Sequence, residues 1–461
     1  MKSPRRQLLR WFSSLLLASC CLWALPLQSA DRLIWKPDHV AAEIGSWDLS
    51  KLLRNLAQVT GWDIYVEPDT KHTVSTKFTD RPPGEALKLL LGDLSFALLP
   101  AQTNGVPRLF VFRTSLQEAT ELIKAPEKAA TKTAKPIANE LIVTLKPGAN
   151  IDDLAKKLGA KVIGRADKFR TYRLQFDDAE AATKARSSLE ENSDVESIEN
   201  NYAISRPPTP DSLTMSSFAP IDLRPKAVTD GNRVIVGLID TPTQRQGTGI
   251  EDFLLAGLAL AGESNPSDTQ PTHGTSMSET ILRALSAGLN GEPSAVRILP
   301  VDVYGNQPST STYDVAMGIY EAVNKGAQII NLSLGSDGDS PFLRKMIQSS
   351  HDQGILFFAA AGNEPVATPT FPAAYPEVIA VTAGTSKGVI ASYANFGNFV
   401  DAIAPGSSIV NFRGQSWVIM GTSASTAYAS GAAAALLERF RTLSRADLET
   451  QIRNLLAFKR Q

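Results

Sequence analysis

Four residues of kinds that can form a nucleophilic catalytic site are spread over the second half of the chain: Asp240, His273, Asn363 and Ser423. A serine hydroxyl becomes an effective nucleophile when a histidine takes its proton, and a carboxylate can hold that histidine in the required tautomer. An asparagine amide can stabilise the oxyanion that then forms. Asp240 precedes His273 by 33 positions, and His273 precedes Ser423 by 150. These residue types could carry out acyl transfer if the fold brings them together.

Each of these residues also has a purely structural interpretation. Ser423 begins a run of small residues that is typical of a helix packed closely on a neighbour. An aspartate at a strand end, such as Asp240, is more often a cap or turn residue. A histidine at the start of a helix can be an ordinary capping or surface residue. Taken one at a time, the residues do not decide between chemistry and packing.

The segments around these residues predict where the side chains lie. Three continuous apolar runs end in polar or small residues, as buried parallel strands do. The first run ends at Asp240 and the third leads to Asn363, while His273 and Ser423 each begin an expected helix. Functional groups of open α/β sheets gather at the carboxyl edge of the strands, so we expect these residues at one edge. The three runs are 234–241, 329–335 and 356–361.

From about Asp222 onwards the chain resembles the subtilisin-like serine proteases, with similar blocks in the family's order and at similar separations. The resemblance implies an α/β fold with a doubly wound parallel sheet, preceded by two small α+β domains. It implies a serine endopeptidase in which Asp240, His273 and Ser423 form the triad and Asn363 contributes to the oxyanion hole. The blocks are VIVGLIDT, HGT, NLSLGS, FFAAAGNE, VIAVTAG, ASYANFG, DAIAPG and GTS.

The resemblance also implies how a substrate binds. An extended peptide would add as a strand between two edges of the protein. The substrate-binding residues expected on one edge are Ser333, Leu334 and Gly335, and those on the other edge are Ser309, Thr310 and Ser311.

Three features depart from the family pattern. Pro242 stands where a glycine usually follows the Asp240-Thr241 pair, and Ala427 stands where a proline usually follows Ser423 by four positions. The connection from Ala287 to Ala295 is shorter than the loop that carries a strong calcium site in many relatives. We therefore expect no required cofactor and no metal at that loop, while structural calcium elsewhere stays open.

Residues 1–30 have the pattern of an export signal, with basic residues, then an apolar stretch, then small residues. The apolar stretch is short for a membrane span. Arg5–Arg10 resembles a twin-arginine signal, and Leu17–Cys20 resembles a lipobox that would acylate Cys20. We expect an exported protein, periplasmic or secreted in a bacterium, that is bound to a membrane only if Cys20 carries a lipid. Cleavage near Ala30 would remove both cysteines of the chain, which excludes disulfides, zinc thiolates and cysteine nucleophiles.

Two small domains and a linker are expected before the catalytic domain, which we place at 206–461. Residues 31–115 resemble the short N-terminal domain of secretins and TonB-dependent receptors, through the stretches WDLSKLL and DRPPGEAL. This resemblance implies a periplasmic protein-contact or signalling module. Residues 116–139 are rich in Ala, Lys and Pro, which is typical of a linker. Residues 140–205 resemble the prodomain of subtilisin-like proteases, which assists folding and then inhibits.

The resemblance to subtilisin-like proteases implies that the chain cuts itself after the prodomain. Pro207, Pro208 and Pro210 constrain the position, because proline lacks the N–H that a substrate strand donates and restricts the residue before it. We therefore expect the cut between Tyr202 and Arg206 or between Asp211 and Phe218, with the prodomain remaining bound as an inhibitor.

The charge and composition of the chain limit the classes of binding partner that we expect. The formal net charge of -1 gives no reason to expect nucleic acid or an anionic membrane. The expected partners are a protein or peptide substrate, the chain's own prodomain, and a periplasmic protein at the N-terminal domain. A competing hypothesis is a catalytically inactive protein, or one that matures a single partner, acting mainly through the N-terminal domain.

Overall fold

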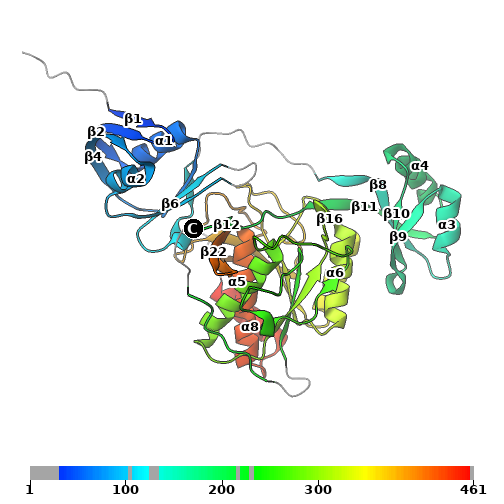
Figure 1. The fold of residues 1–461 in the computed structure, drawn as a ribbon. Coiled ribbons are helices and arrows are strands. Elements are labelled where there is room, and N and C mark those ends of the chain that lie inside the picture. Colours follow the sequence, from blue (N-terminus) through cyan, green and yellow to red (C-terminus); the bar gives the residue numbers. More distant parts are fainter. Residues whose placement is uncertain (1–30, 102–105, 124–133, 214–218, 228–232, 457–461) are drawn as a thin grey trace, which may run out of the picture.

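The computed structural model describes residues 31–101, 106–123, 134–213, 219–227 and 233–456. The chain forms an N-terminal domain (31–123), a middle domain (134–205) and a larger α/β domain (219–456), and the two small domains lie on different sides of the large one (Figure 1). The expected export signal, with Cys20, lies outside the described residues. Within the described ranges, no helix has both the length and the apolar character that a membrane crossing requires.

The α/β domain is built on a seven-stranded sheet in the order β14-β15-β13-β17-β18-β19-β20, and each neighbouring pair is parallel. The central strands are fully buried apolar runs, which suits a sheet covered on both faces. The expected α/β fold with a doubly wound parallel sheet is confirmed. The strands are β13 (Ile235–Asp240), β14 (Leu258–Ala259), β15 (Arg297–Asp302), β17 (Ile329–Leu332), β18 (Leu356–Ala360), β19 (Val378–Gly384) and β20 (Ala402–Pro405).

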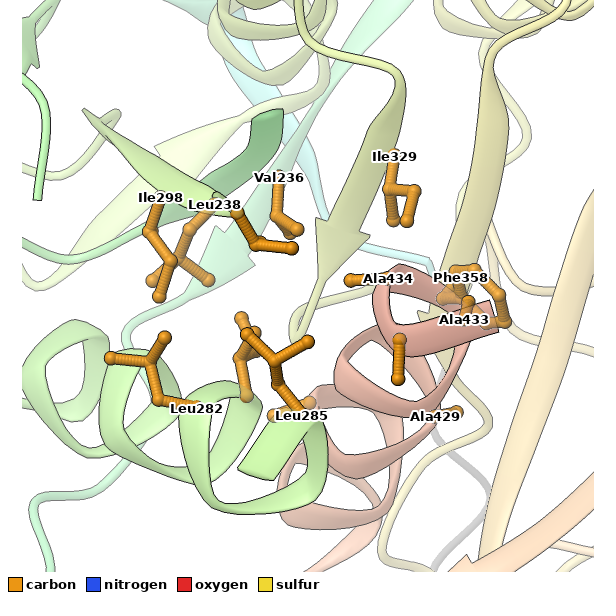
Figure 2. Close-up of a cluster of buried hydrophobic side chains, with 14 of the residues drawn as sticks. Val236, Leu238, Leu282, Leu285, Ile298, Ile329, Phe358, Ala429, Ala433 and Ala434 are labelled. Atoms are coloured by element: carbon orange, nitrogen blue, oxygen red, sulfur yellow. The ribbon is translucent and has the colours of Figure 1, made fainter. Parts of the chain in front are cut away.

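Helices cover both faces of this sheet. Helices α5 (His273–Leu289), α8 (Thr422–Arg439) and α9 (Arg445–Leu455) share one apolar cluster with the strands, and α6 (Thr312–Asn324) and α7 (Pro341–His351) share another. Figure 2 shows leucines of α5 and alanines of α8 beneath the strand residues. The labelled residues are Val236, Leu238, Leu282, Leu285, Ile298, Ile329, Phe358, Ala429, Ala433 and Ala434.

The middle domain packs two helices on one face of an antiparallel sheet. Its sheet has the order β16-β11-β8-β10-β9, and β16 (Ser309–Ser311) belongs to the α/β domain. The strand β11 therefore joins the two domains through backbone hydrogen bonds (Figure 1). The other elements are β8 (Pro136–Leu145), α3 (Ile151–Leu158), β9 (Lys161–Ala166), a 3-10 helix (Asp167–Phe169), β10 (Thr171–Gln175), α4 (Ala179–Glu190) and β11 (Val195–Ser205).

The N-terminal domain holds two helices and two small sheets, in the orders β1-β2-β4 and β5-β6-β3-β7. Asp48 caps α1 by accepting from the Lys51 N–H, and Gly61 ends that helix at φ 71. Its elements are β1 (Arg32–Trp35), β2 (Val40–Asp48), α1 (Leu49–Thr60), β3 (Asp63–Val66), β4 (Thr73–Arg81), α2 (Pro83–Leu91), β5 (Ser95–Leu99), β6 (Arg108–Phe112), η1 (Leu116–Glu118) and β7 (Glu121–Ile123).

The N-terminal domain packs against the α/β domain instead of standing apart from it. The ring of Tyr65 meets the ring of Tyr393 edge-on, with centroids 5.9 Å apart. Both rings belong to one apolar cluster that also contains Leu213 and residues of a second, three-stranded sheet. That sheet has the order β12-β22-β21 and consists of β12 (Asp211–Ser212), β21 (Ser407–Phe412) and β22 (Gln415–Met420).

The expected linker is shorter than the sequence indicates. Residues 116–123 form η1 and β7, because Leu116 and Ala119 are apolar and become buried in the cluster shared with the α/β domain. The middle domain begins with β8 at Pro136, a few residues before the expected boundary at 140. Residues 124–133, the middle of the expected linker, lie outside the described ones.

The close packing of α5 on α8 predicts the effect of a single added methyl group. A Cβ at Gly431 of α8 would lie 2.2 Å from the carbonyl oxygen of Ile281 in α5. We expect Gly431→Ala to lower the free energy of unfolding of the α/β domain by about 1–3 kcal/mol, because overpacking forces the backbone to move. Urea unfolding followed by circular dichroism measures this loss.

Gly257→Ala is the matched control for this change. Gly257 is exposed in the same domain, and its added Cβ would make an ordinary contact, 3.5 Å from the Pro300 carbonyl oxygen. If both variants unfold at the same urea concentration, the close approach of α5 and α8 does not restrict the size of the side chain at position 431.

Candidate functional site

Asp240 and His273 form a buried pair at the carboxyl edge of the large sheet. β13 ends at Asp240, and α5 begins at His273 with Thr272 as its N-cap. The His273 Nδ1 lies 2.8 and 2.9 Å from the two carboxylate oxygens of Asp240. Since Nδ1 donates to the carboxylate, the neutral ring keeps Nε2 as an acceptor. His273 is therefore prepared to take a proton at Nε2.

The approach of α5 to β13 depends on a glycine after the histidine. A Cβ at Gly274 would lie 2.2 Å from the Thr241 carbonyl oxygen. Without that Cβ, the Gly274 N–H donates to the Thr241 hydroxyl at 2.8 Å. The HGT block thus lets the backbone after His273 come close to the strand end that carries Asp240.

Ser423 lies in the first turn of α8 and is 8% exposed. Its hydroxyl donates to the carbonyl of Ser333 at 3.2 Å, and the Ser333 hydroxyl donates back to the Ser423 carbonyl at 3.1 Å. The amide N–H₂ of the buried Asn331 donates to the Ser333 hydroxyl at 2.9 Å. Ser423 is thus fixed to the edge that the sequence predicts for substrate binding.

The orientation of Asn363 follows from its contacts with Thr422. The amide oxygen of Asn363 accepts from the Thr422 N–H at 2.8 Å and from the Thr422 hydroxyl at 3.1 Å. With its oxygen engaged there, the amide group has its N–H₂ donors left for another partner. A Cβ at Gly421 would lie 2.8 Å from the Asn363 amide nitrogen, so this approach needs the glycine.

One cleft collects the expected residues. His273, Asn363 and Ser423 line it, and Asp240 lies behind His273 with 0% exposure. The expected edge residues Ser333, Leu334 and Gly335 line the same cleft. The other expected edge, Ser309, Thr310 and Ser311, forms β16 and pairs with β11. The β16 residues are not among those that line the cleft, and they are connected to it through the residues of β11 that do line it.

The end of the middle domain occupies this cleft in the manner of a peptide strand. Ala203, Ile204 and Ser205 of β11 pair antiparallel with Ser311, Thr310 and Ser309 in that order. The chain then continues uncut through Arg206, Pro207 and Pro208, which line the cleft together with Ser423.

On its other side, β11 contacts the residue before β8. The Ala203 N–H donates to the Lys135 carbonyl at 3.0 Å. The Tyr304 hydroxyl donates to the Ser205 carbonyl at 3.2 Å, and the Tyr202 N–H donates to the Thr312 hydroxyl at 3.2 Å. Among the described residues, the backbone-to-backbone hydrogen bonds of this strand end go to Lys135 and to the β16 edge, so only one of the two edges expected for a substrate is used.

Two side chains of β11 cap helices of the α/β domain. Glu199 accepts from the Phe342 N–H at 3.0 Å, at the start of α7. Asn201 accepts from the Tyr313 N–H at 3.2 Å, at the start of α6. Both contacts satisfy N–H groups that a helix N-terminus leaves without an intrahelical partner. The middle domain therefore docks through two helix ends and one strand edge.

Several residues of the cleft and of the domain contact could not be predicted from the sequence. The sequence predicts a strand only to about Glu199, whereas β11 runs on to Ser205 and reaches the cleft. Thr422, which orients Asn363, and Asn201, which caps α6, carry no signal of their own. The proline cluster after Arg206 is the one available sign that the segment is unusual.

The described residues hold no group of three or more His, Cys, Asp or Glu side chains that could bind a metal ion. The connection from Ala287 to Ala295 is short in the structure as well. The helix α5 ends at Leu289, and the chain turns at Asn290, which adopts φ 54.

Comparisons with known proteins identify the large domain. A model described as the Subtilase family matches residues 231–457. The chain is 30% identical to subtilisin Savinase from Lederbergia lenta over 229 residues, which are 49% of this chain and 83% of that protein. The chain belongs to the subtilase family. A second model, the fervidolysin N-terminal prodomain, matches residues 124–201, so the middle domain is a subtilase prodomain.

Another curated protein is similar in sequence, and two solved structures are similar in fold. A thermophilic serine proteinase from Bacillus sp. (strain AK1) is 29% identical over 321 residues, 66% of this chain and 79% of that protein. Fervidolysin from Fervidobacterium pennivorans has the same fold, with a TM-score of 0.54 at 19% identity over 71% of this chain and 58% of that one. The epidermin leader peptide processing protease from Staphylococcus aureus gives 0.51 at 18% identity, over 69% and 91%.

The Glu199 cap predicts that prodomain docking depends on pH. Burial raises the pKa of Glu199 to about 7, and the charge of Asp339 adds to the rise, while hydrogen bonds from Phe342 and Ser340 oppose it. The docked carboxyl thus binds a proton more tightly than the free one, with its pKa of 4.5. We expect docking to be strongest below pH 4.5 and to weaken as the pH rises through about 7, by at most about tenfold per pH unit.

Amide hydrogen exchange in the full chain measures this dependence. Protection of β11, corrected for intrinsic exchange, should be lower at pH 8 than at pH 5. Glu199→Gln, which keeps a neutral acceptor at the start of α7, should remove most of the difference. Protection that rises with pH in the unmodified chain would contradict the assignment of Glu199.

Proposed function

We propose that this subtilase is an exported serine endopeptidase that hydrolyses peptide bonds with Asp240, His273 and Ser423. The observation that carries the proposal is the convergence of the buried Asp240–His273 pair, Ser423 and Asn363 on one cleft that already holds a peptide strand. Ser423 donates to Ser333 here, and catalytic hydrogen bonds are often formed only in the substrate complex.

Each residue then has a distinct role in the reaction. His273 takes the Ser423 proton at Nε2 as the oxygen attacks the substrate carbonyl, and Asp240 stabilises the imidazolium at Nδ1. The Asn363 N–H₂ and the Ser423 N–H, which lies in the first turn of α8, stabilise the oxyanion. His273 returns the proton to the leaving amine, and a water molecule activated in the same way releases the acyl group.

The chain is made as a precursor whose prodomain inhibits it. β11 covers the β16 edge that a substrate strand needs, and its end lines the cleft beside Ser423. The precursor cuts itself after the prodomain, which then stays bound as an inhibitor until it is removed. No metal or other cofactor takes part in this reaction.

The N-terminal domain recruits a periplasmic protein, in keeping with its resemblance to the short domain of secretins and TonB-dependent receptors. The enzyme acts in the periplasm or outside the cell, with a lipid anchor if Cys20 is acylated. A protease that matures one such recruited partner is the second candidate, and it is favoured by the packing of this domain near β12, just after the occupied cleft.

Ser423→Ala tests the nucleophile. We expect the variant to keep its fold but to lose fluorophosphonate labelling and peptide hydrolysis, by a factor on the order of 10⁴ or more, because the triad acts as a unit. The control is Ser425→Ala, two residues later in α8, whose hydroxyl donates to the Pro405 carbonyl at 3.0 Å. Labelling that persists in Ser423→Ala would make another residue the nucleophile.

Sequencing the N-terminus of the processed enzyme tests self-processing. We expect the new terminus to begin between Tyr202 and Arg206, or between Asp211 and Phe218, because these windows flank the prolines near Ser423. The Ser423→Ala precursor should remain intact under the same conditions. A terminus elsewhere, or the same cut in that variant without added protease, would rule out self-processing at this junction.

A further inference from the structure

The side chain of Arg206 is held by the α/β domain at a defined place in the cleft. Its backbone N–H donates to the Pro308 carbonyl at 2.8 Å, which extends the pairing of β11 with β16 by one step. Its guanidinium nitrogen Nη1 lies 3.0 Å from the carbonyl oxygens of both Gly305 and Gln307. Backbone carbonyls that converge on one guanidinium accept its donors and cannot themselves supply a proton.

An aromatic ring contacts the Arg206 guanidinium, and a buried carboxylate holds the loop that carries this ring. The Arg206 guanidinium carbon lies 5.7 Å from the centre of the Tyr304 ring, which is within the range of a cation–π contact. Asp302, only 6% exposed, accepts the N–H groups of Tyr304 and Gly305 at 2.9 and 2.8 Å. Burial raises the pKa of Asp302, and the positive charge of Arg206 opposes that rise. The carboxyl thus fixes the loop that carries the Tyr304 ring and the Gly305 carbonyl beside Arg206.

We call these five residues the Arg206 subsite: Asp302, Tyr304, Gly305, Gln307 and Pro308. The subsite belongs to the α/β domain and is present whatever chain fills the cleft. The residues that follow Arg206, Pro207 and Pro208, line the cleft together with His273 and Ser423. The position of Arg206 therefore corresponds to a substrate residue one or two places before the bond that is cut.

We propose that the Arg206 subsite selects substrates with a basic side chain, arginine above lysine, one or two residues before the cleaved bond. Arginine fits because its planar group can donate to two carbonyls while stacking on a ring, whereas the lysine ammonium is a single point charge. The inference rests on the proposed protease function and names the class of its substrates. The prodomain segment then carries a substrate-like residue at Arg206, followed by two prolines that substrates need not have. A self-cut in either expected window leaves Arg206 outside the selected position, so the preference applies to separate substrates and not to the tethered junction.

The first test uses the uncut full chain with Ser423→Ala, so that it needs no catalysis. Arg206→Ala should raise the hydrogen-exchange rates of the backbone amides of Ile204 and of residue 206, which pair with the β16 edge, by roughly tenfold. This is the loss of protection expected when charge-assisted hydrogen bonds are removed. Arg206→Lys should fall between Arg206→Ala and the parent. The control is Arg165→Ala, which removes an arginine that pairs with Asp152 within the prodomain. Equal exchange in Arg206→Ala and the parent would overturn the proposal.

The second test uses active enzyme obtained from the full chain and fluorogenic peptides that differ at one position. Peptides with Arg one or two residues before the cut, located by mass spectrometry, should exceed the Ala peptides in kcat/KM by about tenfold to a hundredfold. Asp302→Asn, which keeps the oxygen that accepts from Tyr304 and Gly305, should lower this ratio to a few-fold. Hydrolysis with no preference for Arg would overturn this inference and leave the protease assignment standing. Loss of fluorophosphonate labelling at Ser423 would instead overturn the protease assignment, and the exchange test would still decide the subsite.

Discussion

The pairing of β11 with β16 is the interaction on which the arrangement of the precursor depends. β16 is a three-residue edge whose N–H and C=O groups need partners, and an exposed edge of this kind accepts an added strand. The prodomain supplies that strand and fixes it with side chains that cap two helices, Glu199 on α7 and Asn201 on α6. The same edge is the one a substrate would use. Inhibition and substrate recognition are therefore two uses of one set of backbone groups.

The side of the cleft that carries Asp240, His273 and Ser423 is largely predictable from the sequence, and the reason is physical. Asp240, His273 and Ser423 each sit at an element boundary, where an apolar run or a small-residue helix makes the position recognisable. The apolar strands are fully buried, so their composition specifies them without help from the rest of the chain. Gly274 marks a place where two backbone segments meet too closely for a Cβ, and Gly421 marks one where the Asn363 side chain lies too close for a Cβ.

The parts that the sequence did not predict depend on contacts between domains. Residues 200–205 lack a clear alternation of apolar and polar residues, so their sequence alone does not indicate that β11 continues past Glu199. They form a strand because β16 lies on one side, and β8 with Lys135 lies on the other. Residues 116–123 were expected to be linker, because their few apolar side chains bury little by themselves. They fold because the α/β domain offers Tyr393 and its neighbours as the other half of a core.

The segment from Arg206 to Pro210 is flanked on both sides by strands that pair with the α/β domain. Before it, β11 is bound to β16, and after it, β12 is bound to β22, while Arg108 of the N-terminal domain forms an ion pair with Asp211. As long as the segment is whole, the inhibitory strand is part of the same molecule as the cleft, so diluting the protein does not change how much of it is inhibited. A cut in either expected window, before or after this segment, makes the prodomain, still joined to the N-terminal domain, a separate ligand, whose occupancy falls as the protein is diluted. With the backbone intact, the inhibited fraction does not depend on protein concentration. After a single cut, the uninhibited fraction depends on how far the protein is diluted and on how fast the prodomain dissociates.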